Sequence, residues 1–136
     1  MRVDILCPAG SISGGPEALH QLCGALRTRG IDAAMVYYGV EARLGVPPPY
    51  DYCGAVVRAE AVDMPDTVIV PEVATSLVWR FAAARKAIWW LSVDNFFKWR
   101  HLNPGPSVLA RRPDLLHLCR SDYAYSYLAG PGQRRC

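Results

Sequence analysis

Hydrophobic and polar positions change their spacing several times along the chain, and each change marks an expected strand or helix. Residues 3–7 form a short apolar run that ends at a Pro-Gly loop, which is typical of a buried strand. Residues 17–29 place leucines on one helical face, and Gly30 follows as a C-terminal cap. Pro16 suits the first turn of that helix, where no backbone N–H is needed. Residues 31–38 are rich in β-forming residues and predict the next strand.

The same alternation continues through the rest of the chain. Residues 39–53 contain three consecutive prolines and two tyrosines, and they predict an irregular excursion. Residues 66–71 and 87–93 are apolar runs that predict strands, and residues 73–86 between them have helical spacing. Shorter elements are expected as strands at residues 55–58 and 115–119, a helical turn at 94–100, and a helix from Ser121 to residue 128.

Strands that alternate with helices in this order predict an α/β chain. We expect a Rossmann-like three-layer domain with a mainly parallel sheet. The length of 136 residues suits one domain, and 51% hydrophobic against 20% charged residues is enough to form a core. In such sheets ligands bind beyond the carboxyl ends of the strands, so the residues that follow each strand are the candidate site residues.

The longest connection of this kind is residues 8–17, PAGSISGGPE, between the first strand and the first helix. An ordinary connection takes about two to six residues. Gly14 and Gly15 open the helix, where free N–H groups and the helix dipole favour an anion and glycine lets a phosphate approach closely. The loop lacks the spacing of a P-loop or of a dinucleotide fingerprint, so a flexible loop before a capped helix is an equal alternative.

Polar residues also follow the later strands. Asp94, with Asn95 beside it, is either a general base or a group that holds a sugar hydroxyl, or else the cap of the following turn. Glu72 has the same two interpretations, as a carboxylate in a cleft or as part of the first turn of a helix. Arg120, with Ser121 and Asp122 after it, gathers at the end of the last expected strand. The three histidines have no partner at metal-ligand spacing, and we expect structural roles for them and no metal or cofactor.

Charge and composition argue against several classes of protein. The net charge is +3 with weakly clustered positive residues, which does not indicate a nucleic-acid-binding surface. No apolar run approaches the roughly 20 residues that a membrane span requires, and Asp4 makes the first run a poor signal peptide. The cysteine count is odd, without a Cys-x-x-Cys pair, so neither a zinc site nor a disulfide framework is suggested. Cys7, Cys23 and Cys119 lie in apolar patterns and predict small buried residues of a cytoplasmic protein.

Four stretches resemble the N-terminal half of GT-B glycosyltransferases of the family-4 type. In residues 10–38, GSISGGPEALHQLCGALRTRGIDAAMVYY, a Gly-Gly loop leads into a helix that ends in Arg-Gly, and a strand follows. Residues 66–77 (DTVIVPEVATSL), 86–97 (KAIWWLSVDNFF) and 115–128 (LLHLCRSDYAYSYL) are similar to the later strands of that half, particularly in bacterial polysaccharide-type members. The resemblance spans most of residues 3–129.

The resemblance implies a role for the candidate residues. Gly14 and Gly15 would approach the diphosphate of a nucleotide-sugar, while the rest of this half would bind a glycan-type acceptor. Asp94 best matches the position near the reacting hydroxyl, where the family often has a His or an Asp, and it is our candidate catalytic residue. The expected substrate-binding residues are Ser13, Glu17, Glu72 and Asn95.

The donor-binding half of the family has no counterpart in these 136 residues. Sugar transfer needs donor and acceptor together in a closed, water-poor cleft, so we expect little or no activity without a donor-binding domain or an oligomeric partner. A stand-alone binding or interaction module is the alternative, and a flavodoxin-like nucleotide binder is a third hypothesis that needs further phosphate contacts. We also expect Phe96, Phe97 and Trp99 to be exposed where a second domain would cover them, with packing on the chain's own core as the alternative.

Overall fold

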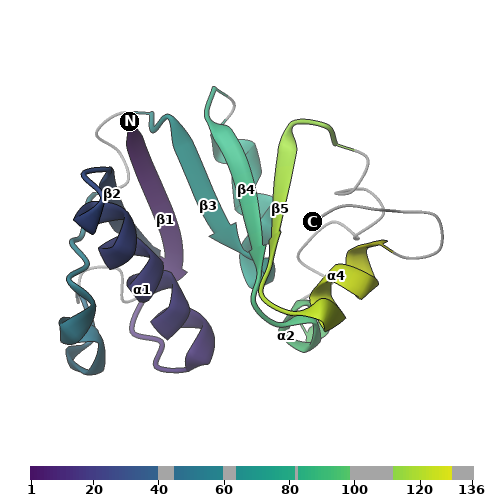
Figure 1. Cartoon of the computed structure of the whole chain (residues 1–136), viewed down its shortest axis with the longest axis horizontal. Helices are drawn as coiled ribbons and strands as arrows, with labels where there is room; N and C mark the ends of the chain where they lie inside the picture. The colour runs from purple at the N-terminus through teal and green to yellow at the C-terminus, as the bar shows by residue number, and fades with distance from the viewer. Residues whose placement is uncertain (40–44, 60–63, 82, 99–111, 130–136) are drawn as a thin grey trace. The chain divides into compact units, whose positions relative to one another are not determined.

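The computed structural model describes residues 1–39, 45–59, 64–81, 83–98 and 112–129 (Figure 1). It confirms the expected α/β, Rossmann-like three-layer fold with a mainly parallel sheet, whose strand order is β2-β1-β3-β4-β5. The strands are β1 (Arg2–Pro8), β2 (Asp32–Tyr38), β3 (Thr67–Pro71), β4 (Arg85–Trp90) and β5 (Leu115–Cys119). The α-helices are α1 (Gly14–Thr28), α2 (Val93–Lys98) and α4 (Asp122–Ala129), and the 3₁₀ helices are η1 (Pro48–Cys53) and η2 (Glu72–Arg80).

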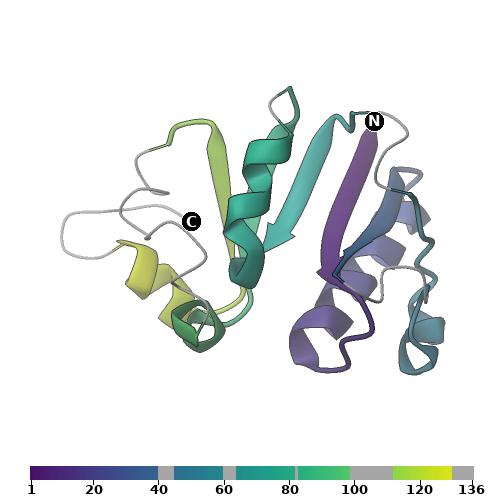
Figure 2. The same cartoon turned by 180° about the vertical axis from the view of Figure 1, so that it is seen from behind.

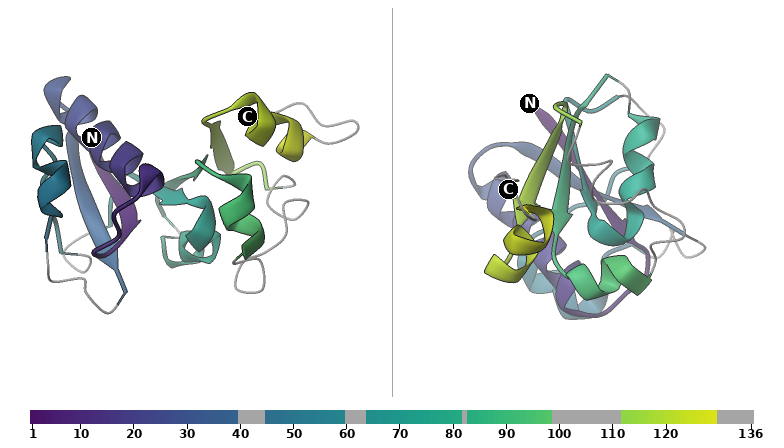
Figure 3. Two further views of the ribbon diagram at one scale, coloured as in Figure 1. Left: turned by 90° about the horizontal axis from the view of Figure 1, so that it is seen from below. Right: turned by 90° about the vertical axis from the view of Figure 1, so that its right-hand side faces the viewer.

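The chain divides into two compact units, Met1–Val68 and Ile69–Cys136. In the first unit β1 and β2 pair in parallel along their whole length, and α1 packs on both strands (Figures 1 and 3). The core between them is largely apolar: Ile5, Leu19 and Met35 are each 1% exposed or less. This burial explains why their spacing predicted β1, α1 and β2 correctly.

The sheet of the first unit continues past β2 by one parallel bridge, between Met35 and Val57. The Met35 N–H donates to the Val56 carbonyl at 2.7 Å, and the Arg58 N–H donates to the Met35 carbonyl at 2.9 Å. The strand expected at residues 55–58 is therefore present as a bridge. When this bridge is counted as a strand, the strand order becomes 3-2-1-4-5-6, which is the order of Rossmann domains.

Two glycines shape α1. A Cβ atom at Gly24 would lie 1.8 Å from the carbonyl oxygen of Cys53, so glycine is what permits η1 to pack directly against the helix backbone. Gly30 has a φ of 80° and ends α1 in a Schellman motif, with the N–H groups of Gly30 and Ile31 bonded to carbonyls of the last turn. The cap expected at Gly30 is confirmed.

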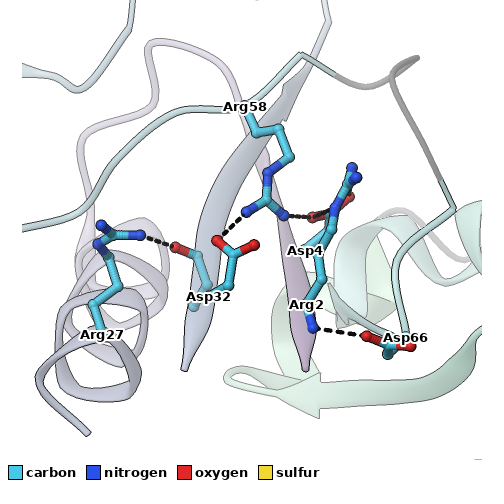
Figure 4. Close-up of polar contacts among 7 residues, drawn as sticks. Arg2, Asp4, Arg27, Asp32, Arg58 and Asp66 are labelled. Carbon is cyan, nitrogen blue, oxygen red and sulfur yellow. Dashed lines mark hydrogen bonds and ion pairs between the residues drawn. The ribbon is translucent and has the colours of Figure 1, made fainter. Parts of the chain in front are cut away.

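Figure 4 shows a network of carboxylates and guanidinium groups near the start of β1 and β2. Asp4 is 1% exposed and accepts hydrogen bonds from Arg58 and, at 3.4 Å, from Arg2. The guanidinium of Arg58 also bonds Asp32 of β2, so one side chain links the bridge segment to both strands. The backbone N–H of Arg2 donates to Asp66 at 2.8 Å. The network lies at the end of β1 opposite to the Gly-rich loop, so its role is to hold the strands.

In the second unit, the segment after β3 is not the α-helix expected at residues 73–86. It forms the 3₁₀ helix η2, which is kinked at Ala74 and lies alongside β4 (Figure 2). The β-branched residues Val73, Thr75 and Val78 weaken an α-helix, because their side chains are restricted against the preceding turn. The last residues of the expected helix, Arg85 and Lys86, belong instead to β4.

The strand expected at residues 87–93 also ends early, at Trp90. Ser92 caps the next helix: its Oγ accepts the Asn95 N–H at 3.2 Å, and its carbonyl accepts the Phe96 N–H at 3.3 Å. A residue cannot both extend the ladder and cap a helix, so the local capping signal of Ser92 decides the end of β4. The helical turn expected at residues 94–100 is confirmed as α2 over its described part.

The expectation of an exposed aromatic surface is wrong for Phe96. Phe96 is 1% exposed, and its ring packs 5.0 Å from that of Trp90 and 6.4 Å from that of Tyr127. Its hydrophobic side chain faces the core because α2 packs against η2 and lies beside α4. The side chain of Phe97 and all of Trp99 lie outside the described residues.

The cysteines follow the expectation in part. Cys7 and Cys23 are buried free thiols, and burial raises the pKa of Cys7 to about 12. Cys119 is half-buried and disulfide-bonded, so the expectation of a small buried thiol is wrong there. Cys119 ends β5, the edge strand in the order of the described strands. Among the described residues, no helix has the length and apolar character needed to cross a membrane.

Candidate functional site

The loop between β1 and α1 is the candidate site in the first unit. The Ala9 N–H donates to the Tyr38 carbonyl at 2.9 Å, which continues the pairing of β1 with β2 by one residue. Gly10, at a φ of 68°, then turns the chain away from the sheet. Ile12 is 63% exposed, and α1 begins at Gly14, three residues before the start inferred from hydrophobic spacing.

The start of α1 presents backbone N–H groups that have no partner within the helix. Ser13 is the N-cap, but its side chain makes no capping bond, and its carbonyl accepts the Glu17 N–H at 3.1 Å. The first N–H groups of a helix have no partner within the helix, and Pro16 has no N–H at all. The N–H groups of Gly14 and Gly15 are therefore available to an anion, and Gly14 is exposed.

Tyr50 of η1 fixes this loop. Its hydroxyl accepts the Ser13 N–H at 2.8 Å and donates to the Ser13 carbonyl at 2.9 Å. The Tyr50 side chain is 3% exposed, and its ring lies 4.8 Å from that of His20. The Pro-rich excursion expected to be irregular thus contains an ordered 3₁₀ helix that braces the residue before Gly14. The tyrosine that follows the three prolines can be recognised in the sequence as a candidate for a structural contact. Nothing in the local pattern indicates that it bonds Ser13.

His20 supports the same brace from inside α1. It is fully buried, with Nδ1 2.6 Å from the Pro16 carbonyl oxygen and Nε2 2.6 Å from the Tyr37 hydroxyl oxygen. A ring nitrogen that faces a carbonyl must carry the hydrogen, so Nδ1 donates to Pro16 and Nε2 accepts from Tyr37. Burial lowers the pKa of His20 and so favours this neutral tautomer. Both ring nitrogens are thereby used within the fold, as the expected structural role requires.

Glu17 is held by η1 as well. Its Oε2 accepts the Tyr52 hydroxyl at 2.8 Å, and Gln21 donates to the same hydroxyl oxygen at 3.0 Å. The bond to Glu17 raises the pKa of Tyr52 to about 12. A carboxylate in the first turn complements the helix dipole, so Glu17 also competes electrostatically with an anion bound at the loop.

We expect Tyr50→Phe to loosen the loop while the fold persists. Loss of the two bonds to Ser13 is expected to cost about 1–2 kcal/mol of unfolding free energy, since each net hydrogen bond contributes about 1 kcal/mol. Amide hydrogen exchange at Ser13 is expected to accelerate. The matched control is Tyr52→Phe, which removes an exposed hydroxyl and leaves Ser13 bonded. Unchanged exchange at Ser13 in Tyr50→Phe would contradict the brace.

The remaining predicted site residues lie in the second unit, at the ends of β3 and β4. Glu72 is 2% exposed, and its Oε1 accepts the Ser92 N–H at 2.7 Å. Burial raises the pKa of Glu72 to about 7. Asp94 and Asn95 are exposed in the first turn of α2, and the capping side chain there is Ser92 rather than Asp94. Glu72 therefore acts in the structure as a tie between β3 and the β4–α2 connection.

No protein-family model, curated protein or solved structure matches this chain. The candidate function therefore depends on the residues, the fold and the geometry of the loop. Within the described part of the chain, no group of three or more His, Cys, Asp or Glu side chains is placed to hold a metal ion.

Proposed function

We propose that the chain is the acceptor-side half of a glycosyltransferase-like protein, whose β1–α1 loop contacts the phosphates of a nucleotide-sugar. The main support is the geometry of the loop. The Tyr50 hydroxyl bonds both the N–H and the carbonyl of Ser13, and the N–H groups of Gly14 and Gly15 follow directly after it. A loop that is ordered before binding loses less conformational entropy when a ligand arrives. Its position, after the first strand of a parallel α/β sheet, is where such folds bind phosphates.

In this proposal a donor-binding domain supplies the opposite wall of the cleft, and a glycan-type acceptor binds the present half. Asp94 is the proposed catalytic residue, and Asn95 beside it is a proposed contact to acceptor hydroxyls, since both side chains are exposed. Ser13 and Glu17 are further proposed substrate contacts. A cytoplasmic location belongs to the same proposal, and the disulfide bond of Cys119 argues against it, because disulfides are rare in reducing compartments.

A stand-alone binding module is the second candidate function, and the packing of Phe96 favours it. The buried ring of Phe96 completes a local aromatic core with Trp90 and Tyr127, so it offers no uncovered surface to a second domain. The two candidates differ in what accompanies this chain. A donor-binding domain encoded in frame after codon 136 or beside it would favour the first, and its absence would favour the second.

The proposal is tested by titrating UDP and a UDP-sugar into the ¹⁵N-labelled chain and following its backbone amide shifts. We expect shifts confined to residues 13–18, with millimolar affinity or weaker. The contacts of the proposed donor-binding domain are absent from this sample, and every loss of about 1.4 kcal/mol of binding free energy lowers the affinity tenfold. Gly15→Val is expected to abolish them, because its side chain blocks close approach to the backbone. Ala25→Val, on an exposed position of the same helix, is the control.

Two outcomes of that titration would count against the proposed function. A loop that stays silent at saturating UDP would leave residues 8–17 as a long strand-to-helix connection. Shifts that persist in Gly15→Val would place the nucleotide elsewhere. Sugar transfer by the 136 residues alone would contradict the need for a donor-binding half.

A further inference from the structure

An open cavity of about 580 Å³ lies in the second unit, where β5 ends and α4 begins. It is lined by residues 117–122 and by Tyr125. Its volume is within the range of about 300–1,000 Å³ that is usual for ligand sites. The polar run of Arg120, Ser121 and Asp122 after the last strand belongs to this lining, and the proposed function does not use it.

Arg120 contributes a positive charge to the cavity. Its backbone N–H donates to the Trp90 carbonyl at 3.2 Å, which extends the pairing of β5 with β4 and fixes where the side chain begins. The side chain is exposed, and among the residues that the structure describes its guanidinium has no carboxylate partner. By contrast, Arg112 in the same unit is paired with Asp114 through two bonds.

Ser121 adds a hydroxyl donor to the lining. The Oγ of Ser121 accepts the Ala124 N–H at 3.2 Å, which leaves its hydroxyl hydrogen to donate into the cavity. The Nδ1 of His117 is already used as the acceptor of the Trp90 indole N–H at 3.0 Å. Asp122, exposed in the first turn of α4, is the one carboxylate among the described residues of the lining.

This donor set fits a phosphate group attached to an organic part. A guanidinium presents two parallel N–H groups that match two phosphate oxygens, and a neighbouring hydroxyl can donate to a third. The ring of Tyr125, 42% exposed on the lining, offers an apolar surface to the remainder of the ligand. The cavity is much larger than the five heavy atoms of a phosphate ion would fill.

We propose that this cavity binds a phosphate monoester, with Arg120 and Ser121 on the phosphate and Tyr125 against the organic part. The inference is independent of the proposed function, because the loop of Gly14 and Gly15 belongs to the other unit. It also assigns a role to Asp122: its carboxylate repels the phosphate and limits the affinity.

The test is a titration of the ¹⁵N-labelled chain with ribose 5-phosphate, with ribose and inorganic phosphate as reference probes. We expect amide shifts at residues 117–125 with the ester, weaker binding of phosphate alone, and no shifts with ribose. Arg120→Gln is expected to weaken binding at least about tenfold, because it removes the positive charge that attracts the phosphate. Asp122→Asn is expected to strengthen binding about threefold, because it removes a negative charge that repels the phosphate. Arg85→Gln, at the exposed start of β4, removes the same charge outside the cavity and is expected to leave the affinity unchanged.

Each variant is first shown to be folded by the dispersion of its amide spectrum, which is expected because Arg120 and Asp122 are exposed. Equal affinity in Arg120→Gln and in Arg85→Gln would overturn the assignment. Shifts of the same size with ribose would show that the phosphate is not recognised. Inorganic phosphate that binds as tightly as the ester would show that the organic part contributes no affinity, which contradicts the role assigned to Tyr125. Shifts confined to residues 13–18 would place the phosphate at the other loop and also overturn it.

Discussion

Arg58→Met is expected to lower the free energy of unfolding by about 3 kcal/mol, because it leaves a buried carboxylate with its nearest positive charge removed. Asp4 is 1% exposed, and Arg58 bridges it to Asp32 on the neighbouring strand (Figure 4). Removing one partner of a buried pair typically costs about 3–5 kcal/mol. We expect the lower end of that range, since Arg2 stays 3.4 Å from Asp4. Urea denaturation followed by circular dichroism measures the loss.

Arg27→Met is the matched control, because Arg27 donates to the Ala33 carbonyl at 3.0 Å and its loss leaves no charge buried. We expect it to cost less than about 1 kcal/mol. Asp4→Asn combined with Arg58→Met then closes a double-mutant cycle, and the cost of Arg58→Met is expected to fall once residue 4 is uncharged. A cost that is the same in both backgrounds, or equal to that of Arg27→Met, would show that the network does not stabilise the strands.

The first unit could largely be predicted from the sequence, because the hydrophobic pattern within each segment is enough to predict its strand or helix. Residues 3–7 and 31–38 are apolar runs that each contain a single aspartate, and they lie within or overlap the strands β1 and β2. Gly30 marked the end of α1 because a positive φ has a clear residue preference. Where local signals competed, prediction failed: the helical spacing of residues 73–86 gave way to a 3₁₀ helix and the start of β4, and Ser92 ended β4 before residue 93.

The groups that shape the candidate site are joined by contacts between residues far apart in the sequence. Gly14 and Gly15 could be found because a Gly-rich loop before a helix has a known chemistry. Tyr50 could not be linked to Ser13, 37 residues away, from any periodicity. The same holds for Arg58 and Asp4, which are 54 residues apart. Patterns of hydrophobicity specify which face of an element is buried, but they do not specify which polar groups meet once it is buried.

Glu72 illustrates this limit, since its two interpretations from sequence were a cleft carboxylate and a residue of the first helical turn. The structure buries its side chain and bonds its Oε1 to the Ser92 N–H, so its carboxyl group is part of the fold. Burial is the largest cause of its raised pKa, and bonds from backbone N–H groups lower that pKa only in part. A carboxyl group with this environment makes the stability of the chain depend on pH near neutrality.

We expect the chain to lose about 3 kcal/mol of unfolding free energy through Glu72 as the pH rises from 4.5 to above 7, since its pKa is raised from 4.5 to about 7 and each unit is worth about 1.4 kcal/mol. The folded state binds the proton more tightly than the unfolded state, so the stabilisation is complete below pH 4.5 and is lost through pH 7. Glu72→Gln is the matched variant, because it keeps the shape and cannot ionise. Chemical denaturation of both proteins at several pH values gives the difference between them, in which the other titrating groups cancel. That difference is expected to move in favour of the variant by about 3 kcal/mol across this window, on top of any constant offset from the amide. A difference that stays constant with pH would show that Glu72 is not the titrating group.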